Sequence, residues 1–117
     1  MFLTINNNIF NVKCLITEKD ISEGMMGKKF SDQFDGLLFF MDQGPHSFWM
    51  KNCIVPLDII FIENGEINKI HSNCQPCKEN PCKSYKGNGD MILELPGNTC
   101  KKYNIEIGDR VNLSGDR

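Results

Sequence analysis

Four residues that could form a binding site fall in one short segment of this chain. The range Ser47–Asp58 reads SFWMKNCIVPLD and contains the single tryptophan, Trp49, followed by Lys51, Asn52 and Asp58. Polar groups inside apolar sequence are costly to bury unless they pair, so this cluster predicts a site. A flat ring, an ammonium, an amide and a carboxylate that converge would suit a small polar ligand such as a sugar, an anion or a carboxylated metabolite.

Asp58 is the central residue of this predicted pocket. The range Leu57–Glu63 is apolar on both of its alternating faces, which predicts a central strand with the Asp58 carboxylate at the edge of a buried surface. Lys51 and Asn52 are the expected partners, because they lie just across the Cys53–Pro56 connection. The alternative is a structural ion pair that fixes this turn, with no ligand involved.

Glu94 offers a second carboxylate in the apolar strand Met91–Leu95, on the same face as Ile92. If it faces the same cavity as Asp58, the two groups could serve as the acid–base pair of a hydrolase or lyase. The alternative without a catalytic role is a solvent-facing glutamate on a half-exposed strand. The whole predicted pocket comprises Trp49, Lys51, Asn52, Asp58 and Glu94.

A cysteine-rich loop carries a different candidate site. The residues His71, Cys74, Cys77 and Cys82 occur at the spacing H-x2-C-x2-C-x4-C, and together they could enclose a zinc ion. Two alternatives stay open: a disulfide or redox pair between Cys77 and Cys82, and inert free thiols. The other cysteines are expected to act as small core residues, and they are Cys14, Cys53 and Cys100.

Length and composition predict one globular domain over residues 1–117. The chain has 13 lysine and arginine residues against 15 aspartate and glutamate residues, a net charge of −2, which argues against a nucleic-acid-binding surface. No apolar run is long enough to cross a membrane. The first residues do not have the pattern of a secretory signal, so we expect a cytoplasmic protein.

The elements that would position these residues are mostly strands. Hydrophobic patterns and turn residues predict strands at Phe2–Ile5, Ile9–Ile16, Gly36–Met41, Ser47–Asn52, Leu57–Glu63, Glu66–His71, Met91–Leu95 and within Ile105–Leu113. The clearest hairpin is the one turned by Asn64 and Gly65, the preferred pair for a type I′ turn. The range Ser72–Asp90 has no periodicity and is expected to be a loop.

Two short helices are expected, at Glu18–Met26 and from Asn98 to Tyr103, with Asn98 as the N-cap of the second. The last residues, Ser114–Arg117, are expected to form a frayed tail. Strands and helices do not alternate as β–α–β units. The sequence therefore favours a mainly β, α+β fold: an antiparallel barrel or sandwich with two short helices.

Several blocks of the sequence resemble those of the domain of unknown function 192 family, also called uncharacterised protein family 0127. The matching blocks are EGMMGKKF (Glu23–Phe30), GLLFFM (Gly36–Met41), GPHSFWMKNCIVPLDIIFIENGEI (Gly44–Ile67), PCKENPCKSY (Pro76–Tyr85), LELPGN (Leu93–Asn98) and IEIGDRV (Ile105–Val111). They come in family order and cover nearly the whole chain after the first hairpin. The resemblance implies a compact, mostly β domain, often secreted or membrane-tethered in bacteria.

The resemblance also implies which positions matter. The family's recurrent positions fall on Met26, Trp49, Met50, Lys51, Asn52, Pro56, Asp58, Cys77, Cys82 and Glu94. Their clustering favours the pocket, whereas Cys74 lies outside the family pattern, which weakens the zinc interpretation. The absence of an exported member's leader suggests a cytoplasmic or phage-encoded version. We therefore expect a small-ligand-binding or accessory domain, with a hydrolase or lyase and a metal-carrying interaction protein as alternatives.

Overall fold

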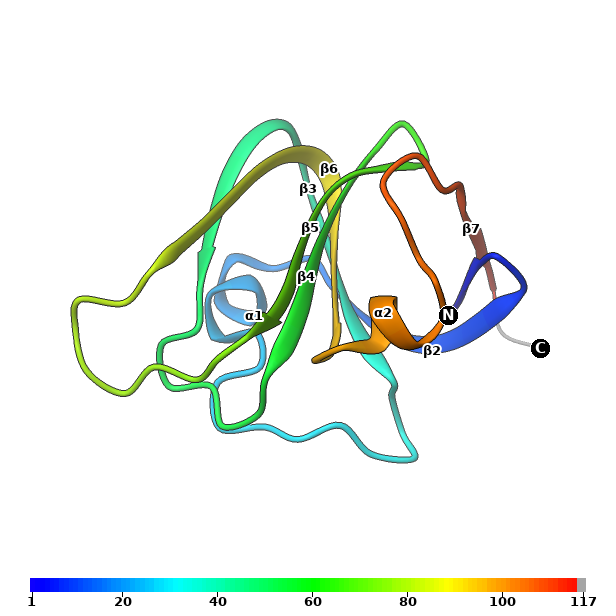
Figure 1. Cartoon of the computed structure of the whole chain (residues 1–117). Helices are drawn as coiled ribbons and strands as arrows, with labels where there is room; N and C mark the ends of the chain where they lie inside the picture. Colours follow the sequence, from blue (N-terminus) through cyan, green and yellow to red (C-terminus); the bar gives the residue numbers. More distant parts are fainter. Residues whose placement is uncertain (116–117) are drawn as a thin grey trace.

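A single curled sheet of seven strands forms the body of the computed structural model, which describes residues 1–115 (Figure 1). In chain order the strands are β1 (Phe2–Ile5), β2 (Asn8–Leu15), β3 (Gly36–Trp49), β4 (Leu57–Glu63), β5 (Glu66–Cys74), β6 (Ser84–Pro96) and β7 (Val111–Ser114). Across the sheet they are ordered β5-β4-β6-β3-β2-β1-β7. The prediction of a mainly β fold with two short helices is confirmed.

The two edges of the sheet meet at the turn between β4 and β5. The Val111 N–H donates to the Gly65 carbonyl at 2.8 Å, and the Ile67 N–H donates to the Asp109 carbonyl at 2.9 Å. The turn has the predicted chemistry, because Asn64 and Gly65 both have positive φ angles of 52° and 73°. These bonds curl the sheet into a partly closed barrel and occupy backbone groups that an open edge would expose.

One strand pair departs from the antiparallel prediction. β2 and β3 run parallel, with Val12 opposite Gly36 and Leu15 opposite Phe39. Parallel neighbours need a crossover connection, which α1 (Glu18–Glu23) and the irregular segment after it provide. The sequence pattern cannot reveal this, because the alternation of a strand reads the same whichever way its neighbour runs.

β3 and β6 are longer than predicted. The segment Gln43–Pro45 predicts a turn, but β3 runs through it, and β6 begins at Ser84, inside the expected loop. The two strands pair along most of their length, with a bulge between Phe40 and Gly44. A bulge accommodates surplus residues within a strand, so the turn residues bend β3 without ending it.

Both helices are short. α1 begins after Thr17, whose side chain accepts the Asp20 N–H at 3.2 Å, and it ends at Glu23, three residues before the predicted end at Met26. α2 spans Thr99–Lys102. Ser114 of the expected tail belongs to β7, and residues 116–117 lie outside the described part. None of the helices within residues 1–115 is long and apolar enough to span a bilayer.

The central strands are buried on both faces, as predicted for the range 57–63. Residues 57–62 of β4 are all fully buried. On one face, the central strands pack against residues of β1, β2, β7 and α2. On the opposite face, they pack against the segment after α1 and the connection between β3 and β4. Figure 1 shows α1 and α2 on opposite sides of these strands. A polar side chain on either face of β4 at residues 57–62, or of β6 at residues 92–95, therefore enters a core.

Candidate functional site

Asp58 is fully buried, and its carboxylate accepts hydrogen bonds from three backbone N–H groups. Oδ1 accepts the N–H groups of Asn73 and Asn98 at 2.8 and 2.9 Å, and Oδ2 accepts the N–H of Cys100 at 2.9 Å. The prediction that Lys51 and Asn52 supply its partners is wrong. Asp58 instead joins β4 to the end of β5 and to the start of α2, where it caps the helix.

This capping role was assigned by sequence to Asn98. Asn98 does occupy the cap position, but it has a left-handed φ of 70° and its side chain makes no capping hydrogen bond. Its backbone N–H points instead to Asp58, forty residues earlier in the chain. A cap supplied from another strand leaves no local sequence signature, which is why the pattern indicated the nearer residue.

Lys51 and Asn52 hold the cysteine loop in place. The Lys51 ammonium donates to the Lys78 carbonyl at 2.8 Å. The backbone of this segment also bonds to the loop, since the Asn52 N–H donates to the Cys77 carbonyl at 2.9 Å and the Cys77 N–H donates to the Met50 carbonyl at 3.1 Å. Both residues of the predicted pocket thus contact the loop and not the Asp58 carboxylate.

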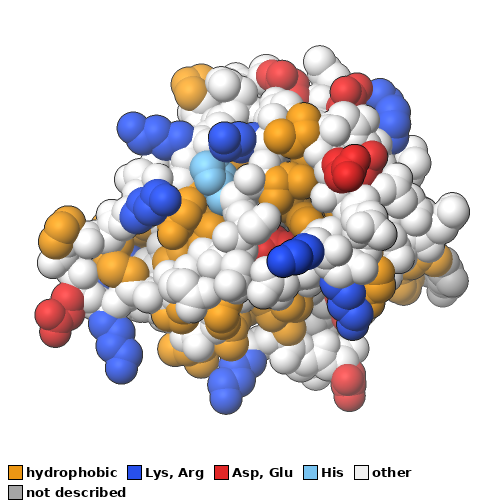
Figure 2. Space-filling view, viewed as in Figure 1, with side chains coloured by type: hydrophobic (Ala, Val, Ile, Leu, Met, Phe, Trp, Pro, Cys, Tyr) orange, Lys and Arg blue, Asp and Glu red, His pale blue; other side chains and the backbone are white. Residues whose placement is uncertain are grey.

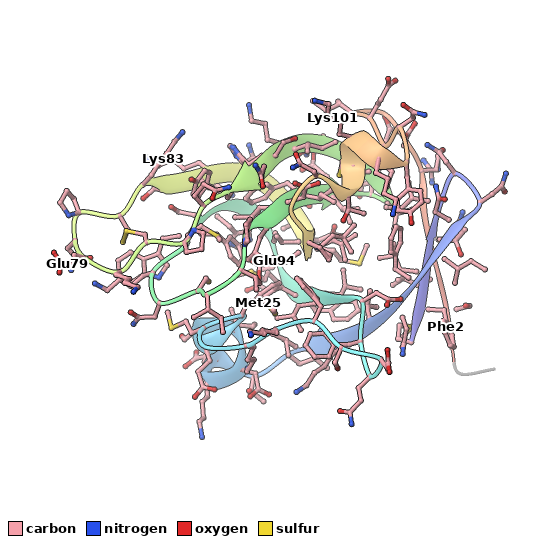
Figure 3. All side chains as sticks on the ribbon, turned by 60° about the horizontal axis from the view of Figure 1, so that its bottom comes forward. Phe2, Met25, Glu79, Lys83, Glu94 and Lys101 are labelled. Carbon is pink, nitrogen blue, oxygen red and sulfur yellow. A yellow bond between two sulfur atoms is a disulfide. The ribbon has the colours of Figure 1, made fainter. Side chains whose placement is uncertain are left out.

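Glu94 is the second buried carboxyl group, and it has a very different environment. Its side chain is 4% exposed, and Oε1 has no hydrogen-bond partner among the described residues. In the sheet it lies between Leu37 of β3 and Ile59 of β4, and Figure 3 shows it in the middle of the molecule, close to Met25. Burial raises the pKa of Glu94 to about 8, so the group is protonated at neutral pH.

The segment after α1 covers Glu94. A Cβ atom on Gly24 would lie 3.8 Å from Glu94 Oε1 and 3.3 Å from Cζ of Phe39, so this backbone sits directly over the carboxyl group. The Lys28 ammonium donates to the Gly24 carbonyl at 2.9 Å. Gly24 itself has a positive φ of 44°, a conformation that favours glycine at this close approach.

Asp58 and Glu94 point to opposite faces of the sheet. Asp58 is opposite Leu95, and Glu94 is opposite Ile59, so the residue opposite each acid is the chain neighbour of the other acid. Directly opposed residues share a face and successive residues alternate between faces. The predicted acid–base pair is therefore not formed, and the five predicted pocket residues do not surround a common cavity.

The cysteine loop contains a disulfide in place of the predicted zinc set. Cys77 is bonded to Cys82, in agreement with one of the alternatives left open by the sequence. Two of the proposed ligands are therefore unavailable to a metal. The other two have other partners: the Cys74 thiol donates to the His71 carbonyl at 3.4 Å, and Nε2 of His71 lies 2.8 Å from the Lys86 carbonyl. Within residues 1–115 no cluster of three or more metal-ligating side chains occurs.

The free thiols are held in their neutral form. Burial raises the pKa of Cys53 to about 11, with a further contribution from Glu94, and burial likewise raises the pKa of Cys74 to about 11. Burial and the neighbouring Asp58 carboxylate raise the pKa of Cys100. Thiols of this kind are poor nucleophiles. Cys53 and Cys100 are core residues as predicted, and Cys14 is only partly buried.

A recess that the sequence did not indicate lies beside α2. Its volume is about 370 Å³, and we call it the aromatic recess after its main lining residues, Phe10, Phe30, Phe34, Asp35, Lys102 and Tyr103. Phe10 and Tyr103 meet edge to face with ring centroids 6.2 Å apart, and Phe30 and Phe34 lie 5.7 Å apart. The Phe30–Phe34 segment and α2 come from distant parts of the chain, so only folding brings these rings together.

Charged side chains also line the aromatic recess. The Lys102 ammonium lies 5.2 Å from the centroid of the Tyr103 ring. Asp35 uses Oδ2 to accept the Asn11 N–H at 2.8 Å, and Oδ1 takes no part in that bond. A cation over an aromatic ring next to a carboxylate offers a ligand both charge and stacking surface. The only sequence signal for this site is the pair of phenylalanines that flank Ser31, Asp32 and Gln33.

Trp49 lies elsewhere, on the face that carries α1. It is 46% exposed and lines a recess of about 230 Å³ with Ile21, Met41 and His46 among its neighbours. Its side chain is therefore open to solvent at this recess. The groups expected beside it are not there, because Lys51 is directed to the cysteine loop and Asp58 is sealed in the sheet.

Two solved structures have the same fold along almost the whole chain. A protein of unknown function from Novosphingobium aromaticivorans matches with a TM-score of 0.85 and 25% identity, over 96% of this chain and 84% of that one. A Sinorhizobium meliloti protein, described as a "putative transcription regulator", matches with a TM-score of 0.83 and 27% identity, over 95% of this chain and 89% of that one. None of the curated proteins compared with the chain matches it.

The family model gives the same answer as the sequence blocks. The model of the family DUF192, described as "Uncharacterized ACR", matches residues 1–113. This range includes both helices and every strand described above except the last residue of β7, Ser114. The chain belongs to the DUF192 family.

Proposed function

We propose that the protein is a binding domain for a small anionic molecule that contains a flat ring, and that the ligand occupies the aromatic recess. The observation that carries this proposal is the convergence of four aromatic rings and the Lys102 ammonium around one hollow of about 370 Å³. Sites for small molecules are usually hollows of this size with apolar walls and a few polar groups. The proposal keeps the predicted class of ligand and moves it to another site.

Each part of the recess suits one part of such a ligand. Phe30 and Tyr103 offer ring faces or edges for stacking, and the Lys102 ammonium would pair with a carboxylate. Oδ1 of Asp35, which does not take part in the bond to the Asn11 N–H, would accept a hydrogen bond from a hydroxyl group. An aromatic hydroxy acid matches all three groups, whereas a simple anion matches only the lysine.

The other predicted functions find less support. An acid–base pair needs two carboxyl groups at one substrate, but Asp58 and Glu94 face opposite ways. A DNA-binding role, suggested by the description of the Sinorhizobium protein, would need a basic surface. On the face seen in Figure 2 the lysine and arginine side chains are scattered, and the net charge of the chain is −2.

The proposal is tested by calorimetric titration with 4-hydroxybenzoate, which has the ring, the carboxylate and the hydroxyl group. We expect saturable binding that is not reproduced by benzyl alcohol, which lacks the carboxylate, or by acetate, which lacks the ring and the hydroxyl group. Phe30→Ala and Tyr103→Ala should each weaken it by about 1 kcal/mol, or roughly fivefold. Lys102→Gln should weaken binding of the carboxylate more than that of neutral aromatic molecules.

Trp49→Ala serves as the matched control, because it removes an exposed ring outside the aromatic recess. It should leave the affinity unchanged. Binding that survives Phe30→Ala and Tyr103→Ala but is lost in Trp49→Ala would refute the assignment of the recess. Equal binding of acetate and 4-hydroxybenzoate would refute the role of the rings.

A further inference from the structure

A second recessed surface lies on the opposite side of the molecule, between α1 and the neighbouring strands β3 and β6. It consists of two hollows, of about 730 and 230 Å³, that share Ile21, Met41 and His46 as lining residues. Because they share these three residues, the two hollows are neighbours, and we call them together the α1 groove. It is separate from the aromatic recess, with which it has no lining residue in common.

The bulge in β3 shapes this groove. Phe40 is paired with Met91, and Gly44 is paired with Gly89, so β3 has three residues between these pairs where β6 has only Asp90. These three residues are Met41, Asp42 and Gln43, so β3 has two more residues than β6 at this point. Bulges bend a strand and redirect its side chains, and they are common beside functional sites. Here the bulge places Met41 and Asp42 in the lining of the larger hollow.

Large apolar side chains remain open to solvent along the groove. Ile16 is 71% exposed and Trp49 is 46% exposed. Met41 and Met91 add flexible thioether side chains to the same lining. Tryptophan is enriched among the residues that dominate binding energy at interfaces, and methionine adapts to varied partners. The apolar part of the groove is therefore suited to bind side chains of another molecule.

The charge of the lining has one sign. The larger hollow is lined by Glu18, Asp42 and Asp90, and neither hollow has lysine or arginine in its lining. No salt bridge to these carboxylates occurs within residues 1–115. Oδ1 of Asp90 is shielded from solvent and has no hydrogen-bond partner in the described part of the chain. The chain as a whole is nearly balanced, so this acidic lining is a local feature.

We propose that the α1 groove docks a partner protein through a peptide segment in which lysine or arginine residues alternate with large apolar residues. The apolar side chains of such a segment would pack on Ile16, Met41 and Trp49, and its cations would pair with Asp42 and Asp90. Complementary charge steers association and selects against wrong partners. An anionic membrane surface or a nucleic acid would be repelled by the same carboxylates.

The test uses a labelled twelve-residue peptide of alternating leucine and lysine, titrated with the protein while fluorescence anisotropy is recorded. Trp49 is the only tryptophan of the chain, so its own emission reports whether the peptide occupies this groove. We expect saturable binding together with a shift of the Trp49 emission. Peptides with glutamate in place of lysine, or serine in place of leucine, should not bind.

Variants separate this site from general attraction between opposite charges. The double variant Asp42→Asn and Asp90→Asn should weaken binding roughly fivefold, with a larger effect at low salt. The matched control, Asp32→Asn with Glu79→Gln, removes the same charge from exposed positions outside the groove and should have little effect. Ile21→Ser should weaken binding without changing the charge.

Several outcomes would overturn the proposal. Binding without a change in Trp49 emission would place the peptide elsewhere, and equal losses in the two double variants would reduce the effect to net charge. Binding of hexylamine with the same emission shift and the same affinity would make the groove a small-molecule site. None of these results bears on 4-hydroxybenzoate binding, because the variants leave the aromatic recess intact.

Discussion

The two buried acids within residues 1–115 lie on neighbouring central strands, one on each face of the same sheet, and their surroundings differ sharply. Asp58 is fully buried and accepts three backbone N–H groups. Glu94 is 4% exposed, and its Oε1 has no partner in the described part of the chain. A charge can be buried where donors replace water, whereas a carboxyl group without donors remains protonated instead.

Burial alone therefore does not identify a functional acid. Asp58 organises the fold, because its donors belong to β5 and to the start of α2. Glu94 satisfies no neighbouring donor, and its raised pKa makes its contribution to stability depend on pH.

The largest expected effect is that of removing Asp58. Asp58→Ala leaves three backbone N–H groups without their acceptor, and each such loss costs about 1–3 kcal/mol, so we expect a loss on the order of 4 kcal/mol or more in the free energy of unfolding. Asp58→Asn keeps one acceptor oxygen but turns an amide group toward a donor, and about half that loss is expected. Urea unfolding followed by circular dichroism measures both.

Asp32→Asn, which changes an exposed aspartate, is the control for Asp58→Asn and should have almost no effect on the free energy of unfolding. If Asp58→Asn lay within about 0.5 kcal/mol of the unchanged protein, the anchoring role of the carboxylate would be wrong.

The next largest effect concerns Glu94 and pH. The pKa of Glu94 is raised from 4.5 to about 8 in the folded protein, so the folded state retains a proton that the unfolded state releases. The stability that this proton provides is complete below pH 4.5 and is lost as the pH rises through about 8. Each pH unit in this window should lower the free energy of unfolding by about 1.4 kcal/mol at most.

Glu94→Gln cannot ionise and should lack this part of the pH dependence. Compared with the unchanged protein, it should gain on the order of 2 kcal/mol between pH 6 and pH 9. Denaturant unfolding at a series of pH values measures the difference. Parallel pH profiles for the two proteins would show that Glu94 is ionised or paired in solution, and would remove the contrast with Asp58.

A smaller effect is expected at the cover of Glu94. Gly24→Ala places a methyl group 3.3 Å from the Phe39 ring at a φ of +44°, so both crowding and backbone strain should cost about 2 kcal/mol. Gly27→Ala is the matched control, because its φ is also positive, +67°, but no atom lies within 4 Å of the added carbon. It should cost about 1 kcal/mol. Thermal unfolding measures both losses of stability. Equal losses in Gly24→Ala and Gly27→Ala would mean that the backbone at Gly24 is not closely packed against Phe39.

Much of the fold follows from local patterns in the sequence. The hairpin at Asn64 and Gly65 was predicted because only residues that accept positive φ fit its turn. β4 was recognised as central because both of its faces are apolar. The long pairing of β3 with β6 was missed, since a bulge hides turn residues inside a strand and no local pattern distinguishes the two cases.

The candidate sites were much harder to predict. The segment with Trp49 and Asp58 suggested a pocket because its polar residues are close in sequence, but the alternation of strands sends their side chains to different places. The aromatic recess was missed for the opposite reason. Its rings come from three segments that are far apart along the chain, and each ring by itself looks like an ordinary core residue.

Local sequence patterns are sufficient to predict the class of fold, the family, most strand positions and the presence of two acids in apolar strands. These properties depend on side-chain periodicity and turn chemistry, which act over a few residues. The donors that each acid meets, and the surfaces that stay open, depend on contacts between distant parts of the chain. The partners of Asp58 lie 15 to 42 residues away, and a one-residue change of register would send Glu94 to the other face.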